Sequence, residues 1–189
     1  MKITNESNQI KKISETMLLL IDAQEKIINP IFEKDKITKN IGNLLKVCEI
    51  LGIKIFLSEQ NPTKLGKTID LLIPKSNYRT VEKMDFSICN SKNLLDSLIS
   101  QGIKNIIICG FETHICIQQS VLDLLDKNYC TYIIVDAMGS RKVFDHEIAI
   151  QRMTSKGATI ASTESIIYEL CQTSLRNEFR DINNLIKNN

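Results

Sequence analysis

Histidine and tryptophan are scarce in this chain of 189 residues, which holds two histidines and no tryptophan. The histidines, His114 and His146, are too few for a metal site built mainly from imidazole ligands. The six cysteines form no C-x-x-C pair, a spacing that suits neither a zinc site nor a disulfide framework. The sequence therefore predicts a protein without a bound metal, and it indicates no cofactor.

Strong net charge and long apolar runs are also absent. The formal net charge is +2 and no block of basic residues stands out, so we expect no nucleic-acid partner. The longest apolar stretch, Met17–Ile21, is far too short to cross a membrane. The first residues lack the apolar core of a secretion signal, so the expected location is the cytoplasm. No glycine follows Met17–Ile21 closely enough to form a phosphate-binding loop, which leaves nucleotide binding poorly supported.

Short apolar runs alternate along the chain with segments of helical periodicity. Apolar runs predict strands, and apolar side chains three and four residues apart predict helices. The predicted strands are 17–21, 53–58, 78–83, 106–109, 131–135 and 158–160, and the predicted helices are 37–51, 94–99, 117–125, 145–155 and 163–171. Residues 61–77 contain two prolines and a glycine, which predict a long irregular segment. This alternation predicts an α/β fold: a doubly wound, mostly parallel sheet of about six strands between two layers of helices.

The whole chain, residues 1–189, is predicted to form a single domain, with a core from about residue 16 to 171 and a C-terminal helix within 172–189. The apolar side chains of this last segment fall on one helical face. They are Leu175, Phe179, Ile182 and Leu185. The segment is therefore expected to dock on the domain or on a neighbouring subunit.

The run from Ile106 to Leu125 places one cysteine where a buried strand gives way to a helix. Residues 106–109 are apolar and end at a glycine, and apolar side chains recur at helical spacing after residue 116. Cys116 is then expected in the first turn of the helix, with Thr113 as its cap. Free N–H groups and the helix dipole at such a position predict a lowered thiol pKa and a reactive thiolate. The alternative is a small buried hydrophobic residue, the usual role of a free cysteine.

Asp22 follows the first predicted strand directly. Open parallel sheets bind ligands beyond the carboxyl ends of their strands, where the strand order reverses. If strands 17–21 and 106–109 flank that reversal, Asp22 and Cys116 face the same crevice although they lie far apart in the sequence. The topology would then pair a carboxylate with a thiol.

Three motifs carry a resemblance to a known family. D-x-Q, at Asp22 and Gln24, ends the first strand; V-E-K, ending at Lys83, closes the third; and G-x-x-x-x-x-C runs from Gly110 to Cys116. With these motifs in this order, the chain resembles the isochorismatase-like cysteine hydrolases over most of its length. The segments SEQNPTKLGKT, EKMDFS and GFETHIC are most similar to the subgroup of isochorismatase domain-containing proteins.

The resemblance implies a catalytic triad of Asp22, Lys83 and Cys116. Cys116 would attack a carbonyl carbon and form a thioester. Asp22 would take the proton of the thiol, deliver it to the leaving amine and later activate water. Lys83 would stabilise the thiolate and hold Asp22 in place. The resemblance also implies a cis peptide bond between Phe111 and Glu112, with the N–H groups of Glu112 and Cys116 aimed at the oxyanion. Members of this family commonly form dimers or larger assemblies, so the resemblance also implies a homo-oligomer. Taken singly, each triad residue has an ordinary structural explanation, and only their combined order favours catalysis.

Departures from relatives narrow the expected substrate. Nicotinamidases hold a metal through an aspartate and histidines after the second strand, whereas residues 58–62 here read SEQNP. True isochorismatases cleave a vinyl ether and lack the cysteine nucleophile. The expected reaction is therefore hydrolysis of the C–N bond of a small-molecule amide. The alternatives are a nicotinamidase-like or thioester hydrolase, or a non-catalytic thiol-sensing or binding protein on the same fold. From nearness in sequence to the triad, the pocket wall is predicted to contain Gln24, Ile28, Phe86 and His114.

Overall fold

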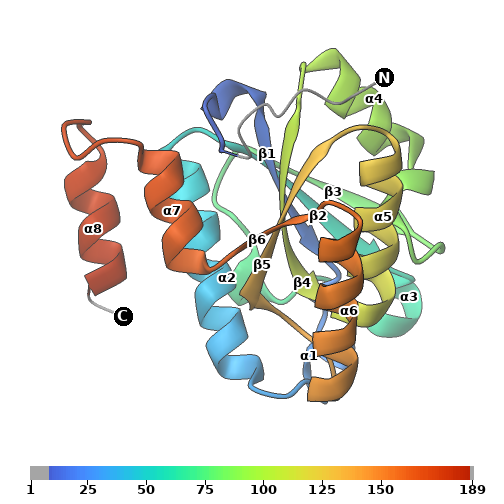
Figure 1. Cartoon of the computed structure of the whole chain (residues 1–189). Helices are drawn as coiled ribbons and strands as arrows, with labels where there is room; N and C mark the ends of the chain where they lie inside the picture. Colours follow the sequence, from blue (N-terminus) through green and yellow to red (C-terminus); the bar gives the residue numbers. More distant parts are fainter. Residues whose placement is uncertain (1–8, 188–189) are drawn as a thin grey trace.

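A six-stranded sheet runs through the centre of the molecule (Figure 1). The computed structural model describes residues 9–187, apart from the side chains of residues 92 and 93. The strands are β1 (Thr16–Ile21), β2 (Lys54–Gln60), β3 (Tyr78–Lys83), β4 (Asn105–Phe111), β5 (Cys130–Gly139) and β6 (Thr159–Ala161). All neighbouring strands are parallel, in the order β3-β2-β1-β4-β5-β6. The prediction of a doubly wound parallel sheet of about six strands is confirmed.

Helices cover both faces of this sheet (Figure 1). One face carries α2 (Lys34–Ile50), α7 (Thr163–Cys171) and α8 (Phe179–Lys187), and the other carries α4 (Lys92–Ser100), α5 (Gln118–Asp126) and α6 (Val143–Ser155). The shorter elements are α1 (Glu25–Ile28), α3 (Pro62–Leu65), the 3₁₀ turns η1 (Ile13–Glu15), η2 (Asp70–Leu72) and η3 (Ile88–Asn90), and the π-helical turn η4 (Thr113–Ile117). In β1, Leu18 and Leu20 join the core under the first face, and Leu19 and Ile21 join the core under the second. Burial on both faces explains why this strand is a continuous apolar run.

The strand order reverses between β1 and β4, which lie side by side. At the ends of these strands, Ile21 pairs with Gly110. A Cβ atom on Gly110 would lie 2.1 Å from the carbonyl oxygen of Ile21, and the φ of +117° is one that other residues rarely adopt. Glycine is therefore required for the two strand ends to approach this closely. Asp22 follows β1 and Cys116 follows β4 beyond these ends, close enough for the charge of Asp22 to act on the thiol, as the rule for open sheets predicts.

The segment 61–77 is more ordered than its composition predicts, because it contains the helix α3 and the turn η2. Hydrogen bonds join the middle of this segment to the end of β2 and to the turn that follows β1. The Thr68 N–H donates to Oε1 of Glu59 at 2.7 Å, and the Ile69 N–H donates to the Ala23 carbonyl oxygen at 3.0 Å. This segment therefore forms a fixed wall beside the end of β1.

The C-terminal segment packs on its own chain. Ile182 of α8 is fully buried in the core that α2 and α7 share, and the Phe179 ring lies 6.4 Å from that of Tyr168. Leu175 was predicted on the same helical face, but its exposed fraction is 90%. That part of the prediction is wrong, because the chain turns between α7 and α8 and the last helix begins only at Phe179. Within residues 9–187, no helix has both the length and the apolar character needed to span a membrane.

Candidate active site

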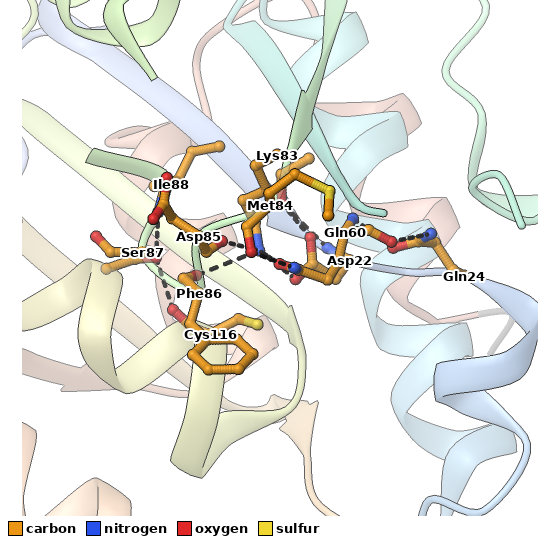
Figure 2. A network of polar contacts seen from close by, with 12 residues as sticks. Asp22, Gln24, Gln60, Lys83, Met84, Asp85, Phe86, Ser87, Ile88 and Cys116 are labelled. Carbon is orange, nitrogen blue, oxygen red and sulfur yellow. Dashed lines mark hydrogen bonds and ion pairs between the residues drawn. The ribbon is translucent and has the colours of Figure 1, made fainter. Parts of the chain in front are cut away.

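Asp22 lies just beyond β1 with its side chain fully buried (Figure 2). Its backbone adopts a left-handed φ of +49°, and its N–H donates to the Ser58 carbonyl oxygen at 3.1 Å. Both carboxylate oxygens accept hydrogen bonds, Oδ1 from the Ser58 hydroxyl at 2.6 Å and Oδ2 from the Lys83 ammonium at 2.7 Å. The carboxylate is thus fixed between a hydroxyl and a cation.

Lys83 ends β3 and reaches Asp22 across the end of β2. Its side chain is 4% exposed and that of Asp22 is 0% exposed. Besides Asp22, the ammonium donates to Oε1 of Gln60 at 2.6 Å and to the Phe86 carbonyl oxygen at 3.2 Å. An ammonium has three donors, so these contacts satisfy it. The two residues form a buried ion pair, in which either charge alone would be costly.

The thiol of Cys116 faces this ion pair (Figure 2). Cys116 is 6% exposed and lies in the π-helical turn η4, which precedes α5. Burial, followed by the charge of Asp22, raises the pKa of the Cys116 thiol to about 12, and Lys83 acts in the opposite direction. The prediction of a lowered thiol pKa is therefore wrong for the resting site. The loss of hydration and the nearby carboxylate outweigh the lysine, so the thiol rests protonated beside a base.

Two features flank the turn that carries Cys116. The peptide bond from Phe111 to Glu112, just before the turn, is cis, as the resemblance implies. On the other side, Oγ of Ser120 donates to the Cys116 carbonyl oxygen at 2.6 Å. Thr113, predicted to cap the helix, instead lies inside the turn with its hydroxyl 2.9 Å from Nδ1 of His146. The π-helical geometry therefore replaces the predicted cap.

Ser58 and Gln60 at the end of β2 are site residues that the sequence-based prediction missed. Gln24, the second polar residue of D-x-Q, binds the Gln60 backbone in both directions: its Oε1 accepts from the N–H at 2.7 Å, and its Nε2 donates to the carbonyl oxygen at 3.0 Å. Residues two apart in a strand share a face, and the pairing of Ser58 with Ile21 places the hydroxyl beside Asp22. Polar side chains two residues apart at the end of a buried strand, as at Ser58 and Gln60, would have indicated from the sequence that both belong to the site.

A cavity of about 330 Å³ opens onto Cys116. Its wall is formed by Lys26, Ile27, Pro30, Gln60, Leu65, Phe86, Glu112, Ile115, Cys116 and Arg141. Of the four residues predicted for the wall, Phe86 lines this cavity. The other three lie outside the wall: Gln24 and Ile28 are buried in the interior, and His114 hydrogen-bonds a serine hydroxyl at 2.9 Å through its Nδ1.

The polar side chains at this site form an ion pair, and their arrangement does not suit a metal ion. A lysine ammonium occupies the centre of the polar network, where it meets a carboxylate and a glutamine oxygen. In the part of the chain that the structure describes, no three histidine, cysteine, aspartate or glutamate side chains gather as metal ligands would.

Comparison with known proteins relates this site to a family. The family model described as Isochorismatase domain matches residues 16–165. Over 179 residues the chain is 35% identical to isochorismatase family protein 1B of Dictyostelium discoideum. This alignment covers 91% of this chain and 86% of that protein. Over 173 residues it is 32% identical to isochorismatase domain-containing protein 2 of Homo sapiens. This alignment covers 91% of this chain and 83% of the human protein. The solved structure of MAR1 ribonuclease from Caenorhabditis elegans aligns with a TM-score of 0.90 and 29% identity, covering 95% of this chain and 92% of that one. The chain therefore belongs to the isochorismatase family, and this membership supports a role as a hydrolase.

Proposed function

We propose that this protein is a cysteine hydrolase that cleaves the C–N bond of a small-molecule amide through a thioester. One observation carries the proposal: the thiol of Cys116 shares a buried site with the Asp22–Lys83 ion pair, and both charges act on its ionisation. The cavity that opens onto Cys116 gives a small molecule access to the thiol. A nucleophile, a base beside it and a group that positions the base are the parts that covalent catalysis needs.

The reaction begins with a proton transfer from the Cys116 thiol to Asp22 as the sulfur attacks the carbonyl carbon. Asp22 then passes this proton to the leaving nitrogen as the C–N bond breaks, which leaves a thioester on Cys116 and releases an amine or ammonia. Water attacks the thioester and gives a proton to Asp22, the C–S bond breaks to release the carboxylic acid, and Asp22 returns the proton to the Cys116 sulfur. Because the thiol rests protonated, it must lose its proton as the sulfur attacks, and Asp22 is the base beside it.

Lys83 serves the cycle as a positioning residue and a fixed cation. It holds the carboxylate of Asp22 at 2.7 Å and lowers the cost of a thiolate at Cys116. For the oxyanion that forms at the carbonyl, we propose the N–H groups of Glu112 and Cys116, as the family resemblance implies.

The test is hydrolysis by the purified protein of a panel of small primary amides, with ammonia release as the readout. The panel includes nicotinamide as an alternative substrate. A small thioester is tested in parallel by thiol release, and RNA by gel analysis of fragments, because the Caenorhabditis elegans protein is named a ribonuclease. We expect at least one amide to be cleaved by the wild type and by neither Cys116→Ala nor Cys116→Ser. Cleavage that survives Cys116→Ala would contradict the proposed nucleophile.

We also propose that the protein is cytoplasmic and forms a homo-oligomer. Apolar side chains on α6 and before α2 support the second proposal, since Phe32, Phe144 and Ile148 are 56%, 70% and 47% exposed. Light scattering of the wild type and of Phe144→Glu tests it. A monomer mass for the wild type at micromolar concentration would overturn it.

A further inference from the structure

Two cationic side chains, Lys26 and Arg141, lie in the wall of the cavity that contains Cys116. Both are exposed, and they come from different elements: Lys26 from α1 after β1, and Arg141 from the loop between β5 and α6. Glu112 is the one carboxylate in this wall, and the Cys116 thiol rests protonated. The charged groups of the wall therefore sum to one positive charge.

Arg141 is held in place without using its whole hydrogen-bonding capacity. Its backbone N–H and its Nε–H both donate to Oε2 of Glu112, at 3.2 and 3.0 Å. Its two terminal nitrogens make no hydrogen bond with any residue that the structure describes. A guanidinium edge of this kind matches the geometry of a carboxylate. Lys26 is held in a similar way, because its ammonium donates once, to the Lys64 carbonyl oxygen at 2.6 Å, and keeps two donors.

The remainder of the wall is mostly apolar. Hydrocarbon and aromatic surface comes from Ile27, Pro30, Leu65, Phe86 and Ile115. Such a cavity is suited to a ligand with an apolar body and one charged end. A single cation on a protein surface does not indicate a ligand. These two cations, however, border the same small cavity as the nucleophile.

We propose that the substrate is anionic: a small amide that carries a carboxylate, with Arg141 and Lys26 binding the carboxylate while the amide carbonyl faces Cys116. This inference rests on the proposed function and narrows its substrate class. Glu112 fixes the Arg141 side chain and at the same time weakens its attraction for an anion.

Two alkylating reagents that differ in charge test the anion site without requiring turnover. Iodoacetate and iodoacetamide both alkylate a thiol, and peptide mapping by mass spectrometry gives the rate at Cys116 for each. The ratio of the two rates measures how strongly the cavity favours the anion. Cys130, which is exposed, provides the reference ratio within the same sample.

Three variants separate charge recognition from structural support. We expect Arg141→Gln to lower the iodoacetate-to-iodoacetamide ratio at Cys116 by about threefold or more at low salt, and Glu112→Gln to raise it. Arg152→Gln, an equal charge change at an exposed position of α6 away from the cavity, should leave the ratio unchanged. A purely structural role of Arg141 would change both rates together and leave the ratio constant, which would overturn the proposal.

A second measurement decides the case in which Cys116 reacts with neither reagent. That result would count against the proposed nucleophile, and the anion site would then be tested by thermal unfolding with butanoate or butanamide present. We expect butanoate to raise the melting temperature of the wild type more than butanamide does, and Arg141→Gln to abolish this difference. Equal shifts in the wild type would overturn the anion site, whatever the reactivity of the thiol.

Discussion

Lys83→Met should destabilise the fold as well as abolish catalysis. The substitution keeps an unbranched side chain of similar length but removes the ammonium from a pair whose side chains are 4% and 0% exposed. The Asp22 carboxylate then stays buried without its cation, and Gln60 and Phe86 each lose a donor to one oxygen. Removing one partner of a buried ion pair typically costs about 3–5 kcal/mol. This is a large share of the roughly 5–15 kcal/mol that stabilises an ordinary domain.

Urea unfolding followed by circular dichroism measures this cost. We expect the midpoint of Lys83→Met to fall sharply with an unchanged m-value, and Asp22→Asn/Lys83→Met to lose less than the sum of the two single variants. Lys104→Met is the matched control: Lys104 pairs with Glu15 at 3.1 Å but is 68% exposed, so its midpoint should hardly move. A loss below about 1 kcal/mol in Lys83→Met would refute the view that this buried pair is strongly coupled.

The strand ends and the thiol give three further predictions. Gly110→Ala places a methyl group against the β1 backbone at a φ that alanine rarely adopts, so the free energy of unfolding should fall by about 2 kcal/mol or more; an unchanged urea midpoint would contradict this. The alkylation rate of Cys116 should keep rising between pH 9 and 11, above the ordinary thiol pKa of about 8.5. Asp22→Asn should move this profile to lower pH, because Asp22 raises the pKa of the thiol; a shift to higher pH would contradict the assigned direction.

The fold was predictable because its signals are local and repeated. The apolar run of β1 and the isoleucines of β4 mark strands that are buried on both faces. Such burial is typical of a parallel sheet that is covered by helices on both sides. The pairing of Asp22 with Cys116 followed from the rule on where open sheets bind ligands. Even so, Leu175 continued the helical pattern in sequence but not in space, since the chain turns before α8 begins.

The chemistry of the site was less predictable, because it depends on contacts between distant segments. Position alone predicted a lowered pKa for Cys116, but the packing that buries the thiol raises it. Nearness in sequence also misled the choice of pocket residues: Ile28 turns into the core, whereas its neighbour Ile27 lines the cavity. Arg141 reaches the site from the loop after β5, and no local pattern in the sequence indicated it.

Acyl transfer to Cys116 tests the proposed thioester chemistry most directly. p-Nitrophenyl acetate is a small activated acyl donor, and rapid mixing with intact-mass and peptide analysis shows where the acetyl group goes. We predict an initial burst of p-nitrophenolate and the mass gain of one acetyl group on the peptide that contains Cys116, both absent in Cys116→Ala. Hydrolysis that proceeds equally fast in Cys116→Ala, with no acetyl group found on Cys116 in the wild type, would contradict the central claim.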